Sequence, residues 1–162
     1  MGSDAPDPSE KARSQALRLL RVRARSVSEL RQRLLKSGHA MTLVDQVLVR
    51  FTEVGLLDDQ RFALDRAFLL SQQRGQGPRR VKADLSRLGI AAETIDAALA
   101  QAYQNISADQ MMRDVLRRRF GEQVLAGGAD PKLRAKAQRF LLSRGFESDS
   151  VFALLSLHRA NT

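Results

Sequence analysis

The sequence predicts an all-α protein, built as an elongated, curved array of three tandem three-helix repeats. One pattern of apolar residues recurs three times along the chain, each time around a glycine. Signals that start and stop helices punctuate the chain at matching intervals, and no segment alternates apolar and polar residues as a strand does. Tandem helical units bury their apolar faces against their neighbours, and such arrays usually form binding surfaces.

The repeat is clearest when Gly38, Gly89 and Gly145 are aligned as a common origin. Five columns are then apolar in all three copies, at positions −8, −4, +6, +9 and +10, which is the spacing of helix faces on both sides of the glycine. The columns are Leu30, Val81 and Ala137; Leu34, Leu85 and Leu141; Val44, Ile95 and Val151; Val47, Ala98 and Leu154; and Leu48, Leu99 and Leu155. We therefore expect these residues to form the core.

The first repeat is expected at residues 10–56, after a disordered tail at residues 1–9 that is rich in proline and acids. Ser26 and Glu29 have the spacing of a capping box, which begins a helix. Gly38 and Gly55 stand where glycines end helices. The expected helices are 10–23, 28–37 and 43–54.

The second repeat is expected at residues 57–106. Asp58 is the predicted N-cap of its first helix, and Gly75 ends that helix. Pro78 suits the first position of the next helix, which ends before Gly89. The expected helices are 59–73, 78–88 and 92–104.

The third repeat is expected at residues 107–162. Ser107 and Gln110 form a second predicted capping box, Gly121 ends that helix, and Pro131 begins the next. The expected helices are 108–120, 131–144 and 148–159. The segment from Gly121 to Asp130 is an expected loop, whose centre at 126–129 is flexible by composition.

The net charge of +9 predicts attraction to polyanions that weakens with salt. Residues 1–56 carry 10 basic and 6 acidic side chains, residues 57–106 carry 7 and 6, and residues 107–162 carry 10 and 6. The two ends are therefore basic and the middle is nearly balanced. Of the basic residues 22 are arginine, which suits phosphate contacts, although a biased genome produces the same excess.

A glycine-rich turn at 74–78 leads into a helix with exposed cationic positions. It lacks the Lys-Ser/Thr ending and the preceding strand of a nucleotide-binding loop, so we expect no nucleotide pocket. Backbone N–H groups and the positive end of the helix dipole favour an anion there. A pair between Arg80 and Asp84 at i+4 can neutralise part of this charge. The cationic residues are Arg74, Arg79, Arg80, Lys82 and Arg87.

In the third repeat, like charges are neighbours on helix faces. Arg113 and Arg117 are four residues apart, and Lys132, Lys136 and Arg139 follow a helical stripe. Such neighbours repel each other in an isolated helix, so the stripe suggests an anionic partner. An ordinary solvent-exposed face is nearly as good an explanation. Arg118 and Arg134 have acids four residues earlier, at Asp114 and Asp130, and are left out of the predicted surface.

The residues give no support to catalysis, a metal site or a cofactor. There is no cysteine, and His39 and His158 stand alone without ligands at metal-binding spacing. The adjacent acids Asp58 and Asp59 point about 100° apart on a helix, so capping is favoured over a metal or catalytic pair. Phe51, Phe140 and Phe146 belong to the core pattern, and there is no tryptophan, which disfavours base reading by stacking.

We expect a cytoplasmic protein with no membrane segment. No apolar run approaches the roughly 18 residues of a membrane span. Residues 1–10 lack the basic and apolar regions of a signal peptide.

Three segments resemble the RecX family of bacterial regulators of the recombinase RecA. They are Leu57-Asp58-Asp59 with Arg61-Phe62; Arg74-Gly75-x-Gly77-Pro78-x-Arg80-Val81 with Leu85 and Gly89-Ile90; and Arg139-Phe140-Leu141-Leu142 with Arg144-Gly145-Phe146. Arg119-Phe120-Gly121-Glu122 adds a further likeness. The resemblance covers about residues 16–158, and Leu88 stands where the family often has a basic residue.

The resemblance implies a non-enzymatic monomer that lies in the groove of the RecA filament on single-stranded DNA. Members of the family limit filament growth and damp ATP hydrolysis, strand exchange and co-protease activity, and so regulate DNA repair and the SOS response. Weak, sequence-independent DNA binding is also expected. The predicted contacts with RecA or its DNA are Arg74, Arg79, Arg80, Lys82, Arg87, Arg113, Arg117, Lys132, Lys136, Arg139 and Arg144.

The alternative is a sequence-specific DNA-binding protein of the helix-turn-helix type. Three-helix units with a basic second or third helix also describe that class, whose members commonly dimerise on paired half-sites. Preference for one duplex sequence by several kcal/mol distinguishes it from a modulator that binds DNA weakly and without sequence preference.

Overall fold

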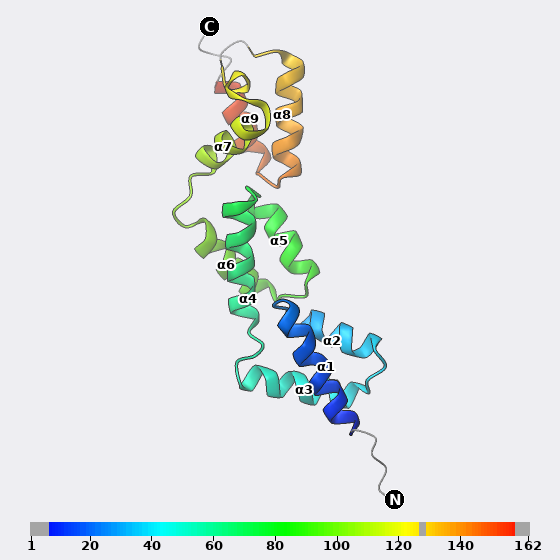
Figure 1. The fold of residues 1–162 in the computed structure, drawn as a ribbon. Helices are drawn as coiled ribbons and strands as arrows, with labels where there is room; N and C mark the ends of the chain where they lie inside the picture. Colours follow the sequence, from blue (N-terminus) through cyan, green and yellow to red (C-terminus); the bar gives the residue numbers. More distant parts are fainter. Residues whose placement is uncertain (1–6, 127–128, 158–162) are drawn as a thin grey trace, which may run out of the picture.

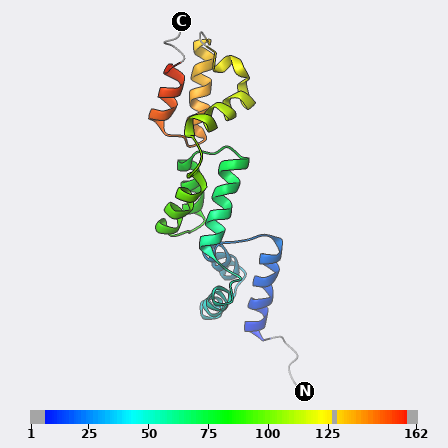
Figure 2. The same ribbon diagram turned by 90° about the vertical axis from the view of Figure 1, so that its left-hand side faces the viewer.

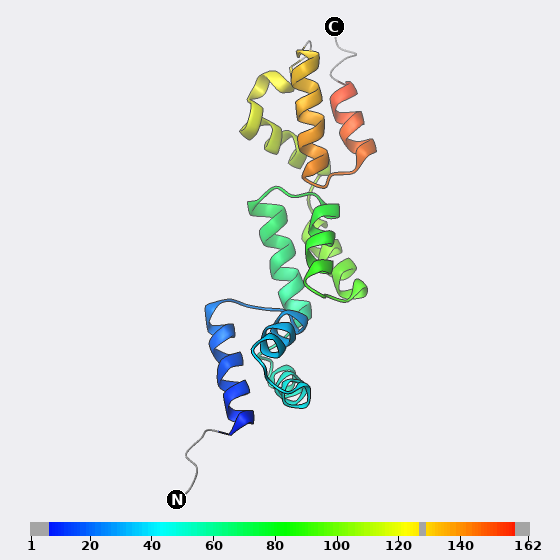
Figure 3. The ribbon, with the colours of Figure 1, turned by 90° about the vertical axis from the view of Figure 1, so that its right-hand side faces the viewer.

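The computed structural model describes residues 7–126 and 129–157. Within these ranges the regular structure is entirely helical, with nine α-helices in three groups stacked end to end (Figure 1). The groups keep the same order along the long axis in the two side views (Figure 2 and Figure 3). The prediction of an elongated array of three-helix repeats is therefore confirmed.

The first group contains α1 (Pro8–Val22), α2 (Val27–Lys36) and α3 (Met41–Glu53). The predicted tail at residues 1–9 is described only from residue 7, and α1 already begins at Pro8, where Asp7 caps the Ser9 N–H. The predicted capping box of Ser26 and Glu29 is present in both directions and begins α2. Proline at the first helical position explains why α1 begins earlier than predicted.

The second group contains α4 (Asp59–Phe68), α5 (Pro78–Arg87) and α6 (Ala92–Tyr103). Asp58 caps α4 as predicted, by accepting a hydrogen bond from the Arg61 N–H. The predicted helix 59–73 has the right extent, but its end is a π-helical turn, η1 (Leu69–Gln73). This turn places two consecutive residues, Leu70 and Ser71, in the interior.

The third group contains α7 (Ala108–Phe120), α8 (Pro131–Ser143) and α9 (Ser148–Leu157). Ser107 caps α7, but the predicted capping box is only half formed, since the Gln110 side chain donates to Asp114 and makes no bond back to the cap. The expected loop after Gly121 contains a 3-10 turn, η2 (Glu122–Val124), which the sequence pattern does not predict. Val124, the last residue of this turn, is buried in the core of this group. The glycines predicted to be flexible, at 127–128, lie outside the described residues.

The repeat pattern accounts for the interior. All residues of the first four apolar columns are at most 7% exposed. In the fifth column Leu48 is buried, while Leu99 and Leu155 are half-buried against their own cores. The buried residues form three clusters, one for each group of helices. Each group therefore has its own core, as expected for a tandem array.

The glycines predicted to end helices adopt the backbone conformation that this role requires. Positive φ occurs at all six: Gly38, Gly55, Gly75, Gly89, Gly121 and Gly145. Residues with a Cβ rarely adopt this region, so glycine is favoured there.

Two hydrogen bonds join the first group to the second. The Ser26 hydroxyl donates to the Leu88 carbonyl, and the Asp59 carboxylate accepts from the Val27 N–H. Leu88 itself is buried, at 9% exposed. No helix in the described part of the chain is long and apolar enough to cross a membrane.

Candidate functional site

The junction between the second and third groups is built from backbone groups. The Gly77 N–H donates to the Arg144 carbonyl at 2.7 Å, and the Arg79 N–H donates to the Gly145 carbonyl at 3.2 Å. A Cβ at Gly145 would lie 2.4 Å from the Arg80 nitrogen, and one at Gly77 would lie 2.5 Å from the Gly145 oxygen. The turn before α5 and the turn after α8 therefore meet through two glycines.

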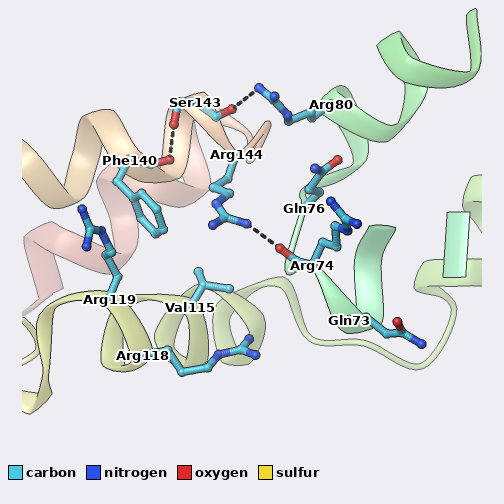
Figure 4. Close-up of a pocket in the computed structure, with 10 residues that line it drawn as sticks. All are labelled: Gln73, Arg74, Gln76, Arg80, Val115, Arg118, Arg119, Phe140, Ser143 and Arg144. Atoms are coloured by element: carbon cyan, nitrogen blue, oxygen red, sulfur yellow. Dashed lines mark hydrogen bonds between the residues drawn. The ribbon is translucent and has the colours of Figure 1, made fainter. Parts of the chain in front are cut away.

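Three side chains reinforce this junction. Arg80 donates from Nη1 to the Ser143 carbonyl at 3.0 Å, and Arg144 donates from Nη1 to the Arg74 carbonyl (Figure 4). The Tyr103 hydroxyl donates to the Gln76 carbonyl at 2.6 Å. Burial raises the pKa of the Tyr103 phenol, so the hydroxyl keeps the proton that it donates.

Beside the junction lies a pocket of about 650 Å³, which we call the arginine pocket (Figure 4). Five of the ten residues that line it are arginines, and none of the ten is acidic. The second group contributes two of these arginines and the third group contributes three: Arg74, Arg80, Arg118, Arg119 and Arg144. The pocket is therefore a concentrated cationic site shared by two repeats.

Aromatic rings and carbonyl groups hold several of these guanidinium groups. The Arg144 guanidinium lies 4.9 Å from the centre of the Phe140 ring, and that of Arg119 lies 5.9 Å from the centre of the Phe120 ring. The two rings pack edge to face, with centroids 5.4 Å apart. Arg118 donates from Nε to the Asp114 carbonyl at 3.3 Å. These contacts restrict side chains that are otherwise mobile.

The structure brings together three of the predicted contact residues: Arg74, Arg80 and Arg144. Sequence reasoning missed Arg118 and Arg119, the other two arginines of the pocket. The i+4 spacing assigns Arg118 to Asp114, but the Asp114 carboxylate bonds to Gln110 and Arg117 instead. For Arg119 a signal was available, because it begins one of the segments that resemble the family.

The other predicted cations of α5 are engaged in ion pairs. Arg79 lies 3.9 Å from Glu147, Lys82 lies 2.9 Å from Asp96, and Arg87 lies 3.1 Å from Asp84. These pairs join α5 to neighbouring segments or to its own helix.

The expected pair between Arg80 and Asp84 does not form. Arg66 and Arg87 bind the Asp84 carboxylate, and Arg80 turns toward the third group instead. Burial opposes the charge of Asp84, but the hydrogen bonds from Arg66 and Arg87 outweigh it and hold its pKa below the usual value.

The predicted cations of the third group divide into two sets. Arg113 pairs with Asp109 at 2.6 Å, and Arg117 pairs with Asp114 at 3.2 Å and with Glu122 at 2.9 Å. A stripe on α8 is exposed and has no ion pair with the described residues: Lys132, Lys136 and Arg139. Only this second set is an uncompensated helical stripe.

The residues considered for metal binding or catalysis have structural contacts. Asp58 and Asp59 bond to different backbone N–H groups, at Arg61 and Val27, and do not converge. His39 contacts the Gln15 side chain at 2.7 Å, and His158 lies outside the described residues. Among the described residues, no three His, Cys, Asp or Glu side chains are grouped to hold a metal.

Family models match each group of helices in order. The model described as RecX, first three-helix domain, matches residues 12–51; the second-domain model matches residues 58–99; and the third-domain model matches residues 108–155. Together they account for most of the chain.

Similar proteins carry the same family name. The chain is 34% identical to regulatory protein RecX of Mycolicibacterium smegmatis over 166 residues, covering 99% of this chain and 87% of that protein. It is 40% identical to regulatory protein RecX of Halorhodospira halophila over 152 residues, covering 93% and 90% respectively.

Solved structures share the fold. A crystal structure of regulatory protein RecX matches with a TM-score of 0.72 at 23% identity, covering 93% of this chain and 72% of the other. The crystal structure of RecX from Lactobacillus salivarius matches with a TM-score of 0.71 at 19% identity, covering 93% and 98%. The tandem three-helix architecture is therefore that of solved RecX structures.

Proposed function

The chain belongs to the RecX family, and on that premise we propose that it is a regulator of the recombinase RecA. In this proposal the chain acts as a cytoplasmic monomer and binds in the groove of the RecA filament on single-stranded DNA. Its effect is mainly inhibitory, limiting filament growth and damping ATP hydrolysis, strand exchange and co-protease activity. The family is one of regulatory proteins rather than enzymes.

The observation that carries this proposal is the shape of the chain together with its charge. Three repeats stacked end to end make a body that can contact several subunits of a helical filament at once. A surface excess of arginine and lysine favours a partner that contains phosphate groups. In the second and third repeats, the arginine pocket and the exposed stripe on α8 are places where cations have no carboxylate partner among the described residues.

The predicted contact residues differ in how ready they are to bind a partner. Five of them must first release an acid within this chain: Arg79, Lys82, Arg87, Arg113 and Arg117. The other six have no carboxylate partner among the described residues: Arg74, Arg80, Arg144, Lys132, Lys136 and Arg139. We propose that the second set binds a partner more readily, because no internal ion pair has to be broken, a cost of about 0–1 kcal/mol for each exposed pair.

An ATPase assay of RecA on single-stranded DNA tests the function directly. Adding this protein at about one copy per several RecA subunits is expected to lower the rate of ATP hydrolysis. Light scattering, which reports filament length, should fall in parallel. A variant in which K132Q, K136Q and R139Q neutralise the α8 stripe should inhibit ATP hydrolysis less than the wild type.

An unchanged ATPase rate and unchanged scattering with equimolar protein would remove the proposal. Tight binding to one duplex sequence, without any effect on RecA, would support a helix-turn-helix DNA-binding protein instead.

A further inference from the structure

We propose that the arginine pocket is a phosphate-binding site, which takes phosphodiester groups of a nucleic-acid strand. This inference rests on the proposed function and deepens it, since it names one discrete contact site and the chemical group that the site takes. It is drawn from the arrangement of five guanidinium groups around one pocket at the junction of two repeats.

The first argument is charge. Five arginines line the pocket without an acidic residue among its lining residues, whereas the cations on the outer faces of α5 and α7 are paired with carboxylates. Like charges brought together raise the free energy of the folded protein unless an anion compensates them. A pocket with this composition therefore favours a multiply charged anion over a neutral ligand.

The second argument is the type of cation. All five are arginine, whose planar guanidinium donates two parallel hydrogen bonds to phosphate or carboxylate oxygens. A single carboxylate carries one charge, while a nucleic-acid strand presents one charge on every phosphate along its length. The charge of the pocket therefore matches successive phosphates better than an isolated acidic side chain.

The third argument is preorganisation. Arg144 lies over Phe140 and is bonded to the Arg74 carbonyl, while Arg80 is bonded to the Ser143 carbonyl. Side chains that are already fixed lose less conformational entropy when a ligand binds. Each of these guanidinium groups retains further N–H donors for an anion.

The location of the pocket adds a consequence for the array. Arg74 and Arg80 come from the second repeat, whereas Arg118, Arg119 and Arg144 come from the third (Figure 4). A phosphate held between them bridges the two repeats. Its binding is therefore expected to stabilise this junction in addition to the backbone hydrogen bonds at Gly77 and Arg79.

The experiment compares two double variants of the full chain, without RecA. R74Q/R119Q removes two pocket charges; among the described residues the Arg74 side chain has no hydrogen-bond partner, and the Arg119 guanidinium contacts the Phe120 ring. R13Q/R18Q removes the same charge from two exposed positions of α1 and serves as the matched control. Fluorescence anisotropy measures the binding of a labelled oligothymidylate to each variant at several salt concentrations.

The pocket variant is expected to bind at least about 10-fold more weakly than the control variant at the same salt concentration. The slope of log affinity against log salt should become shallower by about 0.7 for each phosphate that the variant no longer neutralises. Equal affinities and equal slopes for the two variants would overturn the proposal, because binding would then depend on diffuse charge alone.

A second arm uses tripolyphosphate to separate a phosphate chain from a nucleic-acid strand. If tripolyphosphate raises the melting temperature of the wild type but not that of R74Q/R119Q, the phosphate group itself is the ligand. A pocket-dependent stabilisation by the oligonucleotide alone identifies the phosphodiester strand. If neither compound stabilises the wild type more than the pocket variant, the proposal is wrong, whatever the RecA assay shows.

Discussion

The buried hydroxyl of Ser26 donates a 2.6 Å hydrogen bond to the backbone carbonyl of Leu88, which lies 62 residues further along the chain. The same oxygen accepts a hydrogen bond from the Glu29 N–H at 3.1 Å. One side chain therefore caps α2 and joins the first repeat to the second. Both roles depend on a residue that is fully buried.

Replacing Ser26 by alanine is expected to destabilise the protein by about 2 kcal/mol. The change removes an N-cap, worth about 1 kcal/mol, and leaves the Leu88 carbonyl without its partner at a buried junction. Urea unfolding followed by circular dichroism measures the loss. Ser107 caps α7 at an exposed position, so S107A should cost only about 1 kcal/mol. Equal losses for the two variants would contradict the role of Ser26 at the junction.

Replacing Gly145 by alanine is expected to cost about 3 kcal/mol or more. Gly145 has φ of 85°, and an added Cβ would lie 2.4 Å from the Arg80 backbone nitrogen, so the two repeats must move apart. Gly38 is the control, because it has φ of 87° but no atom near an added Cβ. G38A should cost only the backbone strain, about 1 kcal/mol. Thermal unfolding of both variants measures the difference between the two losses of stability. Equal losses would contradict close backbone packing at this junction.

Replacing Asp84 by asparagine is expected to lower stability at neutral pH but not in acid. The hydrogen bonds from Arg66 and Arg87 depress the pKa of Asp84 in the folded protein. Asp84 therefore stabilises the protein above the pKa that this residue has in the unfolded chain. The stabilisation is lost as the pH falls through its lower pKa in the folded protein. We expect D84N to cost about 1–2 kcal/mol at pH 7. A pH series of urea unfolding curves should show this gap closing in acid; a constant gap would refute it.

Asp59 is expected to show the opposite dependence on pH. Partial burial, reinforced by the nearby charge of Asp58, raises the pKa of Asp59 despite the hydrogen bond from the Val27 N–H. A carboxyl group whose pKa is raised by folding stabilises the protein below its pKa in the unfolded chain. This stabilisation is lost as the pH rises through its pKa in the folded protein. Relative to the wild type, D59N should therefore gain stability as the pH rises through this window.

The alanine variant of Asp59 separates the hydrogen bond from the charge. D59A cannot accept from Val27, so it should be less stable than D59N at every pH, by about 1 kcal/mol. Unfolding measured from acid to neutral pH tests both variants together. A wild type that gains stability relative to D59N as the pH rises would show that the pKa of Asp59 is depressed instead.

Local sequence signals predicted the helices well because they act within a few residues. Ser26, Asp58 and Pro78 begin helices as expected, and Gly89 and Gly145 end them with positive φ. The apolar columns predicted the interior because residues three and four apart share a helix face. The turn η2 was missed because Val124 is buried through contacts with distant helices, and no local pattern indicates such contacts.

The candidate site was less predictable because it depends on which acid each arginine meets. An i+4 rule assigned Asp84 to Arg80 and Asp114 to Arg118, yet Asp84 is bound by Arg66, a residue on another helix. Because Asp84 is occupied from α4, Arg80 is available for the third repeat.

The sequence by itself determined that the chain forms three helical repeats, since apolar periodicity, caps and glycines are local and occur in each copy. Only the tertiary structure decided where charge remains uncompensated, because ion pairs and the arginine pocket depend on the packing of one repeat against the next. That packing is set at Gly77 and Gly145, where two backbones approach too closely for any side chain.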